Sequence, residues 1–101
     1  MAAATLTTGQ IVYDPRGVVE VTPRHAAPRL AALDGMRLAV LDNTKWNARK
    51  LLERTVAELA GDARFTQAGY YKKESFAKSA TPELIGRIAE ESDAVLIAIG
   101  D

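Results

Sequence analysis

The 101-residue chain contains no cysteine and only one histidine, His25. Without cysteine, the chain itself can form no disulfide, no thiolate metal site and no thiol nucleophile. A single histidine also excludes a conventional multi-histidine zinc or iron site. Chemistry must therefore use carboxylates, lysines, tyrosines and amides, or groups supplied from elsewhere. The residues predict no metal site and identify no cofactor.

Net charge and long apolar runs are also lacking. The 13 basic and 13 acidic residues give a formal net charge of zero, which argues against binding of nucleic acid or an anionic membrane through bulk charge. No apolar run approaches the roughly 18 residues that span a bilayer. The N-terminus MAAATLTTGQ lacks the basic-then-apolar order of a signal peptide. We expect a cytoplasmic protein with neither nucleic acid nor membrane as a partner.

Residues 1–35 are irregular in pattern and predict an N-terminal arm. Asp14–Gly17 reads Asp-Pro-Arg-Gly, a turn signal, because proline presets φ and glycine tolerates a positive φ. Either a short hairpin or an arm is therefore expected here. The following TPRHAAPRLAALDG carries two prolines and is typical of a linker, with His25 as an ordinary surface residue.

Residues 36–101 have the regular pattern of an α/β half-domain. Met36–Leu41 and Ala94–Ile99 are short apolar runs typical of strands buried on both faces. A helix is predicted between them from NARKLLERTVAELAGD, with Gly61 in a left-handed C-terminal position. The segment ARFTQAGYY predicts a short strand or an extended segment. A second helix is predicted with Thr81 as its N-cap and Pro82 in its first position.

The predicted order is strand, helix, weak strand, helix, strand. Continuous apolar strands favour a parallel sheet with helices on both faces. Right-handed crossovers would bring Met36–Leu41 and Ala94–Ile99 close together. We therefore predict a partial Rossmann or flavodoxin-like sheet that a partner chain completes, because two confident strands leave unpaired backbone and exposed apolar area.

Polar residues cluster after the first predicted strand, in LDNTKWNARK. Ligands of open α/β sheets bind at the carboxyl ends of the strands, and a helix N-terminus offers free N–H groups to a carboxylate or phosphate. The candidate ligands here are Asn43, Thr44, Lys45 and Asn47. The alternative is that Asn43 or Thr44 only caps the helix and that Lys45 is solvated. Trp46 either lines a pocket or packs the start of the helix onto the sheet, and no glycine-rich phosphate loop is present.

Two further clusters are candidates. Gly100 permits a tight turn after the last strand, and Asp101 would then stand at the crevice; the alternative is a frayed terminus. The segment GYYKKESFAKS is a basic, aromatic-containing loop that could clamp a substrate, with Tyr71 and Lys73 as candidates. The alternative is a solvated connection whose aromatic rings pack onto the core.

The segments LDNTKWNARKLLE and KKESFAKSATPELIGRIAEESDAVLIAIGD together resemble a family of bacterial proteins named for a UGSC motif, in which U is selenocysteine, often replaced by cysteine. In that family a strand ending in Gly-Asp runs directly into the selenocysteine/cysteine-Gly-Ser-Cys segment. Tyr13-Asp14-Pro15 and Leu33-Asp34-Gly35 are also similar to family features. Where the family usually has proline in its Asn-x-Lys-Pro-Asn turn, this chain has Trp46.

The resemblance implies a relation to the thiol or selenol component of amino-acid reductases. The position at which it predicts the reactive residue is the one after Asp101. Either a separately encoded polypeptide would then complete the sheet, or a longer precursor would be cleaved.

We therefore predict the small, cysteine-free subunit of a heteromeric thiol-dependent enzyme of reductase or lyase type. Its partner would carry the Cys-Gly-Ser-Cys-like segment, and heterodimers could form a higher oligomer. Asn43, Thr44 and Asn47, with Tyr71 and Lys73, would bind a small carboxylate-bearing substrate. Lys45 and Asp101 would have catalytic roles. The competing prediction is a non-catalytic structural or regulatory subunit.

Overall fold

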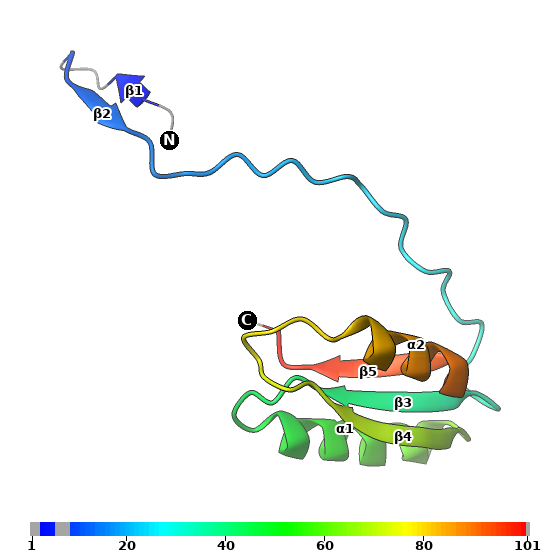
Figure 1. The fold of residues 1–101 in the computed structure, drawn as a ribbon. Coiled ribbons are helices and arrows are strands. Elements are labelled where there is room, and N and C mark those ends of the chain that lie inside the picture. Colours follow the sequence, from blue (N-terminus) through cyan, green and yellow to red (C-terminus); the bar gives the residue numbers. More distant parts are fainter. Residues whose placement is uncertain (1–2, 6–8, 101) are drawn as a thin grey trace.

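The computed structural model describes residues 3–5 and 9–100, which form an N-terminal arm and a separate α/β unit (Figure 1). In the arm, β1 (Ala3–Thr5) pairs antiparallel with β2 (Ile11–Tyr13). The prediction of a turn at Asp14–Gly17 is wrong: these residues follow β2, form no turn and do not join the two strands. The Asp14 carboxylate still accepts the Arg16 N–H at 3.0 Å and pairs with its guanidinium at 2.7 Å.

The segment between β2 and the α/β unit runs extended and away from that unit (Figure 1). Its residues 15–30 are all exposed to solvent. The radius of gyration is consequently 19.9 Å, whereas a compact chain of about 100 residues has a value of about 13 Å. The arm thus contributes little to the core.

The α/β unit is a three-stranded parallel sheet with two helices, as the sequence predicts. Its elements are β3 (Arg37–Asp42), α1 (Ala48–Asp62), β4 (Thr66–Lys72), α2 (Pro82–Glu91) and β5 (Ala94–Ala98). The spatial order is β4-β3-β5, and β3 pairs parallel with both neighbours. Within this unit, β4 therefore lies on one side of β3 and β5 lies on the other. This is the flavodoxin-type order, since the Rossmann order places the third strand beside the second.

The two helices cover opposite faces of the sheet (Figure 1). On the α1 face, Leu52 packs with Val40 and Ala98. On the α2 face, the buried cluster consists of Ala39, Leu41, Tyr71 and Ile88. Because successive side chains of a strand point to opposite faces, the continuous apolar run of β3 serves both clusters. Burial on both faces is what the sequence predicts for this strand.

The helix ends match the predictions only in part. The Thr81 side chain accepts the Leu84 N–H at 3.2 Å, and Pro82 begins α2, which confirms both residues in these roles. The prediction for Gly61 is wrong: α1 includes it and continues to Asp62. Its last turn is closed by Ala63, whose N–H donates to the Leu59 carbonyl at 2.9 Å. No left-handed residue is needed there, because that bond forms with extended backbone at Ala63.

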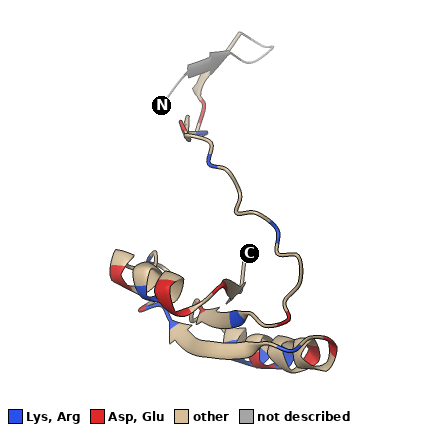
Figure 2. Ribbon diagram, turned by 90° about the vertical axis from the view of Figure 1, so that its right-hand side faces the viewer, with Lys and Arg blue, Asp and Glu red and all other residues tan. Residues whose placement is uncertain are grey.

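Basic and acidic residues both occur along each helix (Figure 2). Several form pairs four residues apart, including Arg49 with Glu53 and Arg87 with Glu91. Within the described chain, no helix is long and apolar enough to cross a bilayer.

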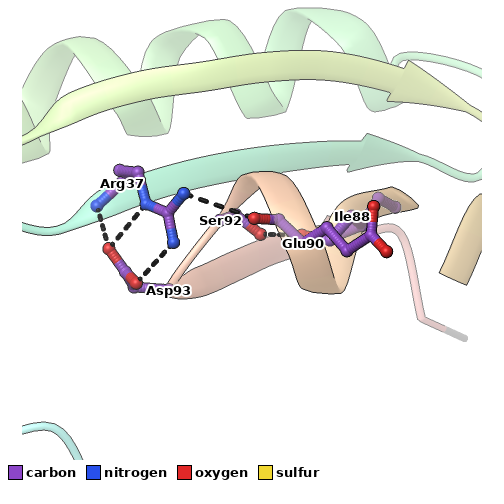
Figure 3. Close-up of polar contacts among 5 residues, drawn as sticks. All are labelled: Arg37, Ile88, Glu90, Ser92 and Asp93. Atoms are coloured by element: carbon purple, nitrogen blue, oxygen red, sulfur yellow. Dashed lines mark hydrogen bonds and ion pairs between the residues drawn. The ribbon is translucent and has the colours of Figure 1, made fainter. Parts of the chain in front are cut away.

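The amino edge of the sheet is closed by a polar clasp between Arg37 and Asp93 (Figure 3). The Asp93 carboxylate accepts the Arg37 backbone N–H at 2.8 Å and pairs with its guanidinium at 3.0 Å. The same guanidinium donates to the Glu90 carbonyl at 3.3 Å, and the Ser92 hydroxyl donates to the Ile88 carbonyl at 2.5 Å. The clasp joins the start of β3 to the turn between α2 and β5. Hydrogen bonds from Arg37 lower the pKa of Asp93.

Candidate functional site

The carboxyl edge of the sheet is organised by a buried carboxylate at the end of β3. Asp42 is only 3% exposed. One of its oxygens accepts the Thr44 N–H at 2.7 Å, and the other accepts the Tyr70 hydroxyl. Burial, followed by the hydrogen bond to Asp42, raises the pKa of Tyr70 to about 12. Asp42 therefore fixes both the loop that follows β3 and the end of β4.

The loop between β3 and α1 is tied to β5 through Asn43. Its side-chain N–H donates to the Ile99 carbonyl at 2.6 Å, and its backbone N–H donates to the Ala98 carbonyl at 3.0 Å. Its side-chain oxygen accepts the Lys45 N–H at 3.3 Å. The Asn43 amide is thus engaged within the protein, and its contribution to a site is to position the loop.

The same loop contains two residues in the left-handed backbone region, Thr44 at φ 68° and Asn47 at φ 65°. Such values are uncommon outside glycine and are found often where a loop is shaped for a function. Asn47 is the N-cap residue of α1, although its side chain makes no capping hydrogen bond. Neither Asn43 nor Thr44 is the N-cap, contrary to the alternative raised from the sequence.

An open cleft of approximately 420 Å³ lies against this loop and the ends of β3 and β4. Its lining consists of Asp42, Thr44, Lys45, Trp46, Asn47, Arg49, Lys50 and Lys72. Four of these side chains are cationic and one is anionic, and the anionic one is the buried Asp42. Among the described residues that line the cleft, cationic side chains therefore outnumber anionic ones, in a chain whose net charge is zero.

The beginning of α1 adds to this positive potential. Its first turn contains no acidic residue to offset the positive end of the helix dipole. Arg49 lies in that turn, with its guanidinium carbon 5.1 Å from the centre of the Tyr70 ring. It also pairs with Glu53 at 2.9 Å, and this hydrogen bond is the main reason that its pKa is raised. The pairing holds Arg49 over Tyr70 and partly neutralises it.

A second hollow, of approximately 460 Å³, adjoins the cleft and is lined by Lys45, Trp46, Phe76 and Ile99. It shares Lys45 and Trp46 with the cleft. Trp46 is 88% exposed, so it forms a wall between the two spaces and does not pack the start of α1 onto the sheet. Cationic and apolar groups therefore adjoin at this edge.

The remaining candidates from the sequence lie elsewhere. Tyr71 is buried on the α2 face, where its hydroxyl donates to Glu91. Lys73 lines a different hollow, between the end of β4 and the start of α2, and its N–H donates to the Asp42 carbonyl at 3.0 Å. Asp101 lies outside the described residues. The structure thus brings together Thr44, Lys45 and Asn47, and it does not add Tyr71 or Lys73 to them.

Several residues of the cleft were missed by the sequence analysis. Arg49 and Lys50 follow Asn47 directly and could have been identified, since the first turn of a helix faces the same space as the loop before it. Lys72 could be placed only from the pairing of β4 with β3, in which it lies opposite Asp42. The contact between Tyr70 and Asp42 likewise depends on the pairing of β4 with β3.

No cluster of three or more histidine, cysteine, aspartate or glutamate residues that could hold a metal ion occurs among residues 3–5 and 9–100. The donors at the cleft are instead ammonium, guanidinium, amide and hydroxyl groups. Such a set suits an anion, because each member can donate a hydrogen bond to a carboxylate or phosphate oxygen.

Comparison with known proteins gives one match. The model of the UGSC family matches residues 11–101, which include both the arm from β2 onward and the whole α/β unit. No curated protein and no solved structure matches the chain.

Proposed function

The chain belongs to the UGSC family, and from that premise we propose that it is the small, cysteine-free subunit of a cytoplasmic, thiol-dependent enzyme of reductase or lyase type. Its cleft would bind a small carboxylate-bearing molecule. The observation that carries this proposal is the excess of cationic side chains around the N-terminus of α1, at the carboxyl edge of a parallel sheet. This edge is where open α/β folds bind their ligands.

Within the proposal, each group at the cleft has a role. The substrate carboxylate lies at the first turn of α1, where free backbone N–H groups and Lys45 stabilise its charge. The Asn47 amide donates to its polar atoms. The Thr44 hydroxyl donates to the Asn43 carbonyl at 2.6 Å and can accept a hydrogen bond from the substrate. Asp42 keeps their loop in place. An apolar substituent lies against Trp46. Such positioning lowers the entropic cost of bringing the substrate to a reactive group.

The reactive group itself comes from outside these residues, because the chain contains no cysteine. We place the thiol or selenol on a partner polypeptide with a Cys-Gly-Ser-Cys-like segment, as the resemblance implies. That segment would approach the carboxyl edge beside the cleft, with Asp101 next to it. The same partner would complete the sheet at one of its two outer edges, since β4 and β5 each have a single strand neighbour in the described chain.

Binding can be tested on the isolated chain because Trp46 is its only tryptophan. Titration with acetate, glycine and inorganic phosphate should change the tryptophan fluorescence in a saturable way. Lys45→Ala should weaken binding by on the order of ten- to hundredfold, the worth of a hydrogen bond to a charged group. Lys78→Ala is the matched control, since it removes the same charge from a lysine that does not line the cleft. Equal effects of the two substitutions would contradict a specific site.

Asn47 requires two substitutions because its backbone is left-handed. Asn47→Gly removes the amide and keeps the φ of 65° accessible, whereas Asn47→Ala also strains the backbone. Equal loss of binding in both variants assigns the effect to the side chain. Loss in the alanine variant alone assigns it to the loop conformation.

The location of the thiol has its own test. Intact mass measurement of the native complex should show this chain together with a second, cysteine-containing polypeptide. The coding sequence after Asp101 is a second check. A cysteine codon, or a UGA codon decoded as selenocysteine, followed there by Gly-Ser-Cys, would place the reactive group on the same polypeptide. That result would contradict the two-polypeptide arrangement and leave the binding cleft unaffected.

A structural or regulatory subunit is the second candidate, and the apolar groove between α2 and β5 favours it. The groove measures approximately 320 Å³ and is lined largely by apolar side chains. In the assembled complex, Lys45→Ala and Asn47→Ala distinguish the two functions. Loss of turnover with the complex intact supports the enzyme, whereas unchanged turnover supports the structural subunit.

A further inference from the structure

The arm contains a segment with strong strand character that forms no strand. Residues 18–22 read Val-Val-Glu-Val-Thr, and four of these five side chains are β-branched, the type favoured in strands. Gly17 precedes the segment and Pro23 follows it, so both of its ends are defined. In the structure these residues are extended, but they belong to no sheet.

The apolar side chains of this segment have no cover in their own chain. Val18 is 90% exposed and Val19 is 80% exposed. In an extended chain successive side chains point to opposite sides, so Val19 and Val21 share one side, and Val18, Glu20 and Thr22 share the other. The segment would therefore present one apolar side and one more polar side if it joined a sheet.

The α/β unit has an unpaired sheet edge at β5. Its outer edge has no neighbouring strand among the described residues, and an open edge strand is a template for pairing with another chain. On the α2 face of β5, Ile97 is 57% exposed and Val95 is 43% exposed. Together with the exposed Ile85 of α2, they line the groove between α2 and β5.

The segment and the edge fit each other in length and polarity. β5 has five residues, as does the segment Val18–Thr22. When the segment is added beside β5, Val19 and Val21 continue the apolar row of Val95 and Ile97 and cover the groove. Glu20 then points to the other face of the sheet.

We propose that Val18–Thr22 of one chain adds as a strand to the β5 edge of a second copy of the same chain, with a reciprocal exchange that forms a symmetric dimer. The arm leaves its own α/β unit in an extended direction (Figure 1), and Pro23 and Pro28 favour an extended linker. Exchange of identical segments forms a dimer at a low cost in free energy, since each copy both donates a strand and accepts one. The family match includes this part of the arm, so the segment lies within the region that the family model describes. The proposal does not depend on the cleft or on a thiol.

The test begins with the mass of the purified 101-residue chain in solution, by light scattering and sedimentation. The expected result is a dimer in which the amides of residues 18–22 are protected from hydrogen exchange. Val19→Lys with Val21→Lys should give a monomer, whereas the matched control Glu20→Lys with Thr22→Lys should remain a dimer. Because all four positions lie in an exposed arm, circular dichroism should show the α/β unit unchanged.

Mixing of variants identifies the acceptor. Ile97→Lys should also give a monomer, through loss of the docking surface. Mixed with the Val19→Lys and Val21→Lys chain, it should form a heterodimer, since one variant keeps an intact arm and the other an intact β5. If Ile97→Lys does not fold, Val95→Thr serves as a milder acceptor variant and should raise the dissociation constant.

Three outcomes would overturn the proposal. The first is a monomer whose arm amides exchange freely. The second is a monomer whose arm amides are protected, which would mean that the arm folds back onto its own β5. The third is a dimer that the arm substitutions do not affect. None of them bears on anion binding at the cleft, so failure here is distinguishable from failure of the proposed function.

Discussion

The two edges of the sheet differ in how their charges are satisfied. At the amino edge, the Arg37 and Asp93 side chains form an ion pair (Figure 3). Asp93 also accepts the Arg37 backbone N–H, and the Arg37 guanidinium donates to the Glu90 carbonyl. At the carboxyl edge, the buried Asp42 is occupied by Thr44 and Tyr70, and the surrounding lysines leave an excess of positive charge. Both edges are rich in charged residues, but the described lining of the cleft at the carboxyl edge carries more cations than anions. The anion site that we propose therefore lies at the carboxyl edge.

The largest effect on the difference between the two edges is expected from removal of the Asp42 carboxylate. Asp42→Ala leaves the Thr44 N–H and the Tyr70 hydroxyl without their acceptor, which should cost about 2–4 kcal/mol of unfolding free energy. Anion binding should be lost as well, because the loop is no longer held. Urea denaturation followed by circular dichroism measures the first effect, and Trp46 fluorescence measures the second. Unchanged stability would show that Asp42 does not organise this edge.

A second prediction separates loop position from charge. Lys72→Ala removes a cation from the cleft without altering the loop after β3, and should weaken anion binding by about tenfold. Arg37→Ala removes a cation at the other edge and should leave that binding unchanged. Both are measured in the same fluorescence titration. A larger effect from Arg37→Ala would reverse the assignment of the two edges.

The Tyr70–Asp42 contact predicts an alkaline dependence of stability. The folded state raises the pKa of Tyr70 from 10.0 to about 12, so it holds the phenolic proton more tightly than the unfolded chain does. The resulting stabilisation is complete below pH 10 and is lost as the pH rises towards 12. Tyr70→Phe should flatten this part of the pH dependence and remove one phenolate step near pH 12 from the ultraviolet titration. A Tyr70 step at the ordinary value would contradict the contact.

The smallest effect is expected at the amino edge. Arg37 lowers the pKa of Asp93 below its ordinary value of 3.8, so the clasp stabilises the fold above that value and is lost as the pH falls through the lowered one. Because both side chains are substantially exposed, solvent screens the pair and the effect is small. Asp93→Asn should slightly reduce the acid dependence of the urea midpoint and leave anion binding intact. An equal acid dependence in the variant and the parent chain would show that the clasp contributes nothing.

Much of the fold could be predicted from local patterns. The apolar run of β3 and the Thr81-Pro82 start of α2 are signals contained in a few neighbouring residues, and both were identified correctly. Gly61 was misassigned because a glycine near a helix end does not show whether the helix stops there. The last turn of α1 is instead closed by extended Ala63.

The sequence predicted only those site residues that lie together in one continuous segment. Thr44, Lys45 and Asn47 lie in a single loop and were identified together. Lys72 reaches the cleft, and Tyr70 reaches Asp42, through the pairing of β4 with β3, in which Tyr70 lies opposite Val40 and Lys72 opposite Asp42. A register of this kind is not visible in the sequence.

The most direct measurement of the central claim is a titration of the ¹⁵N-labelled chain with glycine, followed by amide NMR shifts. We expect saturable shifts at the start of α1 and in the loop before it, at Thr44, Lys45 and Arg49, with none at Arg37 or Asp93. Lys45→Ala should weaken them and Lys78→Ala should not. Shifts spread evenly over the lysine-bearing surface, or confined to the amino edge, would contradict an anion site at the carboxyl edge of this sheet.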